Sequence, residues 1–157
     1  MNTLTAGAKA PLFTLQDQQG NAVSLQECLT RGPVLVYFYP KASTPGCTVQ
    51  ACGLRDSKAE LDSHKVTVLG ISPDPVAKLA KFAEKQSLNF TLLSDEDHSV
   101  ADAFGVWGEK KFMGKIYDGI HRLSFLINTD GTIAHVFDKF KTSDHHQVVL
   151  TQIAAQQ

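Results

Sequence analysis

Two cysteines, Cys47 and Cys52, lie in the stretch of this sequence whose residue types best support chemistry. Thr44 and Pro45 precede them, and a threonine followed by a proline is typical of an N-cap and a first helical turn. Cys47 then falls near the third helical position, where free backbone N–H groups and the positive end of the helix dipole converge. A thiol placed there is biased towards the thiolate, the form that attacks electrophiles. The pattern therefore predicts a reactive cysteine at position 47.

The spacing of the two cysteines also constrains any chemistry that they share. Five positions along a helix separate two Cα atoms by roughly 8.7 Å, whereas a disulfide needs them within about 7 Å. If Cys47 and Cys52 are partners, oxidation must therefore unwind at least one turn of the helix. The third cysteine, Cys28, is expected to be a small packing residue.

The elements predicted around the cysteines alternate between strands and helices. They are a hairpin of 11–15 with the segment around Val23, a helix at 25–29, a strand at 34–39, a helix from 45 to about 63, a strand at 66–71, a helix opened by Asp74-Pro75, a strand at 90–93, an amphipathic turn at 100–104, strands at 121–127 and 133–137, and a helix capped by Ser143 or Asp144 and running through 153. Residues 105–119 are too irregular to assign. We predict a single α/β domain over 1–157 with a thioredoxin-like fold, in which helices flank a central mixed sheet with an N-terminal hairpin.

Composition excludes several classes of protein. The chain has 157 residues, 43% of them hydrophobic and 20% charged, as in a globular protein, and its net charge of −1 offers no basic field for nucleic acid or an anionic membrane. The N-terminal residues lack the features of a signal peptide, and no apolar run is long enough to span a bilayer. We therefore expect a cytoplasmic protein, in which cysteines are more often catalytic than structural.

One segment resembles a known family. Residues 37–48, Tyr-Phe-Tyr-Pro-Lys-Ala-Ser-Thr-Pro-Gly-Cys-Thr, followed by Cys52 and by residues 54–56, resemble the active-site segment of the peroxiredoxins, above all their bacterioferritin comigratory protein (peroxiredoxin Q) group. The likeness continues through 69–72, 92–95, 104–107 and 119–127, so it covers nearly the whole chain.

The resemblance implies a monomeric thiol peroxidase, without a cofactor, that reduces hydrogen peroxide and organic hydroperoxides. By it, Cys47 is the peroxidatic cysteine that becomes a sulfenic acid, Cys52 is the resolving cysteine that forms a disulfide with it, and thioredoxin is the reductant. Pro40, Thr44 and Arg122 occupy the other positions of the family's site.

The chain departs from that family at two places. Gln50 stands where many relatives carry a glutamate, and residues 79–85 lack the resolving cysteine that some relatives place there.

Two other functions are alternatives to a peroxidase. A thiol–disulfide oxidoreductase would be expected to carry a Cys-x-x-Cys pair, which this sequence lacks. A non-enzymatic peroxide sensor would be oxidised without catalytic turnover. Cys52 as a core residue, Thr44 as a mere N-cap and Arg122 as a surface ion-pair partner are the plainer alternatives. A zinc site is not predicted, because no second pair of cysteines or histidines has a spacing that would match Cys47 and Cys52. Residues 108–115 do not fit the P-loop pattern.

Overall fold

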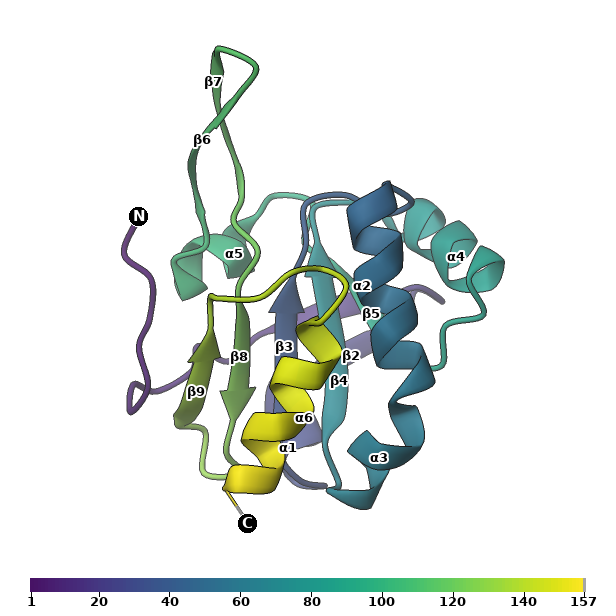
Figure 1. Cartoon of the computed structure of the whole chain (residues 1–157), viewed down its shortest axis with the longest axis vertical. Coiled ribbons are helices and arrows are strands. Elements are labelled where there is room, and N and C mark those ends of the chain that lie inside the picture. The colour runs from purple at the N-terminus through teal and green to yellow at the C-terminus, as the bar shows by residue number, and fades with distance from the viewer. Residues whose placement is uncertain (157) are drawn as a thin grey trace.

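Seven strands form a central sheet that carries helices on both faces (Figure 1). The computed structural model describes residues 1–156. The strands are β1 (Thr14–Asp17), β2 (Ala22–Ser24), β3 (Val34–Phe38), β4 (Thr67–Ser72), β5 (Thr91–Ser94), β6 (Trp107–Phe112), β7 (Lys115–Ile120), β8 (Ser124–Ile127) and β9 (Ile133–Phe137). The helices are α1 (Leu25–Leu29), α2 (Pro45–Asp56), α3 (Lys58–Ser63), α4 (Val76–Lys85), α5 (Ser99–Phe104) and α6 (His145–Ala155).

The central sheet is mixed, as predicted, with the strand order β2-β1-β5-β4-β3-β8-β9. Strands β3, β4 and β5 run parallel, whereas β1 joins β5, and β8 joins β3, in antiparallel pairs. The N-terminal hairpin of β1 and β2 is confirmed, although β1 begins at Thr14 and not at position 11. The carboxyl end of β3 leads directly towards α2, so the topology places the start of that helix at one edge of the sheet.

Two hydrophobic cores lie on the two faces of this sheet. All five residues of β3 are buried, and they alternate between the cores: Leu35 belongs to one, and Val36 to the other. The first core receives side chains from α2, α4 and α6, and the second receives side chains from α1 and α5. A strand that is covered on both faces reads as a continuous apolar run, which is why β3 was predictable.

Two predicted elements differ from the structure along their length. The helix expected from position 45 to about 63 is interrupted at Ser57, which ends α2 and precedes α3. The strand expected at 121–127 begins only at Ser124, so residues 121–123 form a connection between β7 and β8. Elsewhere the predicted strands and helices are present: those at 25–29 and 133–137 have the predicted boundaries, and the others are shifted by up to three positions.

The segment left unassigned at 105–119 contains a second sheet, the β6–β7 hairpin, which extends away from the rest of the fold (Figure 1). Its two-residue turn, Met113-Gly114, has positive φ at both positions, 51° and 80°. This is the backbone that two-residue hairpin turns favour, usually with Asn-Gly or Asp-Gly. Methionine at the first position hid the signal. No helix within residues 1–156 is long and apolar enough to cross a bilayer.

Candidate active site

Cys47 lies at the third position of α2, where the sequence pattern placed it. Pro45 is the first helical residue, and Cys47 is only 2% exposed. Free cysteines are found at all three positions, 28, 47 and 52. The thiol of Cys47 thus sits within the first turn, where backbone N–H groups have no partner inside the helix.

Thr44 occupies the N-cap position but does not cap through its side chain. Its backbone is extended, with φ −81° and ψ 154°, and its hydroxyl donates to the carbonyl oxygen of Lys41 at 2.8 Å. The predicted N-cap position of Thr44 is therefore confirmed, but its side chain makes no capping hydrogen bond. Having donated backwards into the loop, Thr44 Oγ keeps its lone pairs as acceptors.

Arg122 joins the start of α2 from the connection between β7 and β8. Its Nη2 donates to Cys47 Sγ at 3.2 Å, and its Nη1 donates to Gln50 Oε1 at 2.9 Å. A Cβ on Gly46 would lie only 3.1 Å from Arg122 Nη2, so the glycine leaves room for the guanidinium at the helix start. The alternative of a surface ion pair is wrong, because Arg122 is half-buried and forms no ion pair within residues 1–156.

Gln50 is a residue whose role the sequence alone left open. Its side chain is fully buried, and its only hydrogen bond within residues 1–156 is the one that Oε1 accepts from Arg122. The amide nitrogen Nε2 has no partner there. A neutral amide thus holds the arginine, and no carboxylate within residues 1–156 forms an ion pair with Arg122.

Lys110 brings a second cation towards the site, and sequence reasoning missed it. Its Nζ donates to the carbonyl oxygen of Ile120 at 2.8 Å, which ties β6 to the end of β7 just before Arg122. Burial and then the charge of Arg122 lower the pKa of Lys110, while Cys47 acts in the opposite direction. Lys110 is thus a second basic side chain whose charge is coupled to that of Arg122.

Asp74 is a further residue that sequence reasoning did not connect with the site. It was expected to open α4, yet its carboxylate faces the loop before α2, where Oδ2 accepts from the backbone N–H of Ala42 at 2.7 Å and from Ser72 Oγ at 2.8 Å. Asp74 is only 6% exposed. This buried carboxylate fastens the loop that carries Pro40, itself half-buried, to the end of β4.

Cys52 lies on the same unbroken helix as Cys47 and is half-buried. Its thiol contacts Gln86 Oε1 at 3.6 Å, so it faces the end of α4 and not Arg122. Because α2 is continuous from Pro45 to Asp56, helical geometry separates the Cα atoms of the two cysteines by roughly 8.7 Å.

Cys28 lies elsewhere, buried on α1 in the second core. Its Sγ accepts from Arg31 Nη2 at 3.5 Å. Burial raises the pKa of the Cys28 thiol, which Arg31 only partly offsets, so this thiol is poorly suited to attack an electrophile. The structure agrees with the expectation of a packing residue.

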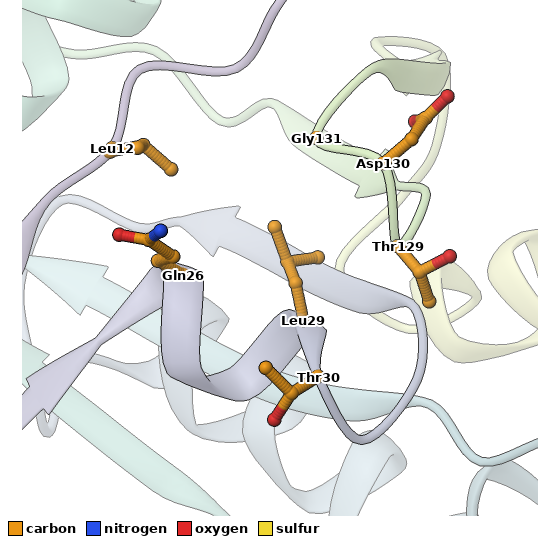
Figure 2. Close-up of a pocket in the computed structure, with 7 residues that line it drawn as sticks. All are labelled: Leu12, Gln26, Leu29, Thr30, Thr129, Asp130 and Gly131. Carbon is orange, nitrogen blue, oxygen red and sulfur yellow. The ribbon is translucent and has the colours of Figure 1, made fainter.

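Within the described residues, a metal site or a separate surface cavity would be an alternative to the surroundings of Cys47. Within residues 1–156, no group of three or more histidine, cysteine or acidic side chains is arranged to hold a metal ion. A cavity of about 310 Å³ lies between α1 and the turn after β8. Figure 2 shows the residues that line it, Leu12, Gln26, Leu29, Thr30, Thr129, Asp130 and Gly131. None of the residues around Cys47 lines it.

Comparison with known proteins agrees with this geometry. The AhpC/TSA family matches residues 6–136. The putative peroxiredoxin bcp of Haemophilus influenzae is 67% identical over 151 residues, and peroxiredoxin Bcp of Escherichia coli is 67% identical over 150, each match covering 96% of both chains.

Solved structures give the same relationship. Peroxidoxin BcpB from Mycobacterium tuberculosis superposes with a TM-score of 0.88 at 37% identity, covering 98% of this chain and 99% of that one. The bacterioferritin comigratory protein of Xanthomonas campestris gives 0.87 at 31% identity, covering 98% and 97%. The chain therefore belongs to the AhpC/TSA family and, within it, to the bacterioferritin comigratory protein (peroxiredoxin Q) group of peroxiredoxins, which makes it a thiol peroxidase of thioredoxin-like fold.

Proposed function

We propose that Cys47 is the peroxidatic nucleophile of this peroxidase and that hydrogen peroxide and organic hydroperoxides are its substrates. The observation that carries the proposal is the 3.2 Å contact between Arg122 Nη2 and Cys47 Sγ in the first turn of α2. A guanidinium donor and the helix dipole both favour a negative charge on sulfur. The X. campestris bacterioferritin comigratory protein has alkyl peroxide reduction activity, which supports this class of substrate.

In the first step, the Cys47 thiolate attacks one oxygen of the peroxide and the O–O bond breaks. The sulfur is oxidised to a sulfenic acid, and the departing oxygen takes a proton and leaves as water or an alcohol. Arg122 and the backbone N–H groups of Gly46 and Cys47 stabilise the negative charge that develops on the departing oxygen. Thr44 Oγ accepts a hydrogen bond from the peroxide, and Pro40 shields the thiolate from water.

In the second step, the Cys52 thiol condenses with the sulfenic acid, forming an intramolecular disulfide and releasing water. Cys52 is half-buried and on the same helix, so α2 must unwind by at least a turn between the two positions. The weak thiol contact to Gln86, at 3.6 Å, offers little resistance to this movement.

In the third step, thioredoxin supplies the two electrons that reduce the Cys47–Cys52 disulfide to two thiols. We propose that the chain works as a monomer in the cytoplasm, where thiols are kept reduced. A single chain holds both cysteines, so the cycle requires no second subunit.

The test is thioredoxin-coupled peroxide consumption by wild type, Cys47→Ser, Cys52→Ser and the matched control Cys28→Ser. We expect no turnover for Cys47→Ser, and wild-type turnover for Cys28→Ser. Cys52→Ser should undergo one oxidation and accumulate sulfenic acid at Cys47, detected by mass spectrometry after dimedone labelling.

Substantial turnover in Cys47→Ser, or a disulfide that includes Cys28, would contradict the scheme. Oxidation of the wild type without repeated turnover would indicate a peroxide sensor. Reduction of insulin disulfides in place of peroxide would indicate a thiol–disulfide oxidoreductase.

A further inference from the structure

The tip of the β6–β7 hairpin, residues 111–117, concentrates apolar side chains on the surface. Within residues 1–156, seven large apolar side chains are exposed, and four of them lie at this tip: Phe112 (65% exposed), Met113 (87%), Ile116 (63%) and Tyr117 (46%). Such clustering marks an interaction surface, whereas single exposed apolar residues such as Leu12 need no explanation.

The same tip is positively charged. Residues 111–117, Lys-Phe-Met-Gly-Lys-Ile-Tyr, contain two lysines and no acidic residue, and the exposed acidic residues next to them, Glu109 and Asp118, lie opposite each other towards the base of the hairpin. Lys111 and Lys115 are exposed, and neither forms an ion pair within the described chain. The strand register sets Lys111 opposite Ile116 and Lys115 opposite Phe112, so each ammonium group accompanies an apolar side chain across the hairpin.

We propose that this tip docks onto an anionic lipid surface. Apolar side chains that enter the boundary between headgroups and acyl chains, flanked by lysines that reach lipid phosphates, are the combination that binds such interfaces. The hairpin extends away from the central sheet, so the tip can reach a flat surface ahead of the remainder of the fold (Figure 1).

Charge favours lipid over a second copy of the chain as the occupant. Two identical tips in contact through residues 111–117 would bring four lysines together, and like charges oppose such a contact. The net charge of −1 gave no reason to expect an affinity for anionic membranes, because that sum hides the two positive charges of residues 111–117.

Co-flotation with lipid vesicles tests the proposal. The wild-type protein should float with phosphatidylcholine vesicles that contain about one-third phosphatidylglycerol, remain behind with pure phosphatidylcholine, and be released by high salt. Lys111→Gln with Lys115→Gln should weaken partitioning about 25-fold, from about fivefold for each lysine removed. Phe112→Ser with Ile116→Ser should weaken it as well.

Two matched controls separate the tip from the rest of the surface. Lys78→Gln with Lys81→Gln makes the same change in net charge on exposed positions of α4, and Leu12→Ser removes an isolated exposed apolar side chain; both should bind like wild type. Peroxide consumption in solution should be unchanged in the tip variants, since the tip holds none of the groups around Cys47. Unchanged consumption also verifies that the tip variants are folded.

Three results would overturn the proposal. The first is the absence of wild-type binding to anionic vesicles, and the second is an equal loss of binding in the α4 control. The third is a tip variant that changes the sedimentation of the protein but not its binding to vesicles, because this result would indicate that the tip is an interface between copies of the chain. The proposal is independent of the cysteine chemistry, because Cys47→Ser should bind vesicles like wild type.

Discussion

Arg122 and Cys47 are 75 positions apart in the sequence, yet Arg122 Nη2 lies 3.2 Å from Cys47 Sγ. Strand pairing explains the contact. Strands β3 and β8 are antiparallel with Tyr37 opposite Ser124, so the residues that follow β3 and those that precede β8 meet at the same edge of the sheet. The register of two buried strands thereby positions a cation beside a thiol that starts a helix.

Replacing Arg122 by lysine should lower kcat/KM for peroxide by about 10- to 100-fold. Lysine keeps the charge, but its donors are all on one nitrogen, so it cannot reproduce the fork by which two guanidinium nitrogens reach Cys47 and Gln50. Stopped-flow peroxide reduction measures the effect. Arg31→Lys is the matched control, since Arg31 contacts the sulfur of Cys28 in the same way at 3.5 Å and should leave kcat/KM unchanged. Equal losses in both variants would indicate general destabilisation.

Gln50 should act by orienting Arg122. Two substitutions can distinguish this orienting role from a contribution of the Gln50 side chain to packing. Gln50→Leu has a similar size but no acceptor, so it should lower kcat/KM by about tenfold, the value of one hydrogen bond to a charged group. Gln50→Glu restores an acceptor for Arg122 Nη1 and should retain most of the activity. The pH dependence of iodoacetamide alkylation at Cys47 provides a second measurement, which a purely structural role would leave unchanged. Equal activity in Gln50→Leu and wild type would contradict the orienting role.

The local part of the site was predictable because its signals are contained in a few neighbouring residues. Thr44, Pro45 and the apolar run before them specify a strand, a turn and a helix start, and Cys47 lies at the predicted position. The hydrogen-bond partner of the Thr44 hydroxyl was not predictable. The position of an N-cap follows from the sequence, but the choice between a helical N–H and the Lys41 carbonyl depends on the loop conformation.

The distant part of the site was not predictable from residue patterns. Arg122 entered only through the family resemblance, since its contact with the helix start depends on which strands are neighbours and in what register. Asp74 was misread for a related reason: an aspartate before a proline is typical of a helix start, but here the carboxylate turns back to Ala42 across the sheet edge. Lys110 was missed with the whole β6–β7 hairpin, whose turn lacks the usual residues.

Replacing Asp74 by alanine should lower the free energy of unfolding by roughly 3 kcal/mol, because two donors would lose a buried carboxylate. These donors are the Ala42 N–H and the Ser72 hydroxyl. Peroxidase activity should fall as well, since the loop before α2 loses its fastening. Urea unfolding measures the first effect. Asp102→Ala is the control, because its ion pair with His98 is exposed and contributes little.

Asp74→Asn should behave much like wild type, because its amide oxygen can still accept both hydrogen bonds. A variant Asp74→Ala that unfolds at the same urea concentration as wild type would show that the loop is held by other contacts.

His145 should make the stability of the protein depend on pH below neutrality. Its side chain is fully buried against Ser124, and burial, reinforced by the charge of His146, lowers the pKa of His145 to about 3. The unfolded chain has an ordinary histidine pKa near 6.5. As the pH falls below about 6.5, His145 binds a proton in the unfolded state but stays neutral in the folded state. The free energy of unfolding should therefore fall by up to about 1.4 kcal/mol per pH unit until about pH 3.

Urea unfolding between pH 7 and pH 4 checks this slope in wild type and in two variants. His145→Gln removes the titrating group and should give a shallower dependence on pH by about one proton. Ser124→Ala removes only the 2.7 Å hydrogen bond, so it should lower the stability at every pH but keep the slope, because burial is the main cause of the shift. Asp144 acts against the shift and Arg122 with it, but both are weaker than burial. A slope that is unchanged in His145→Gln would show that other groups, and not His145, take up the proton on unfolding.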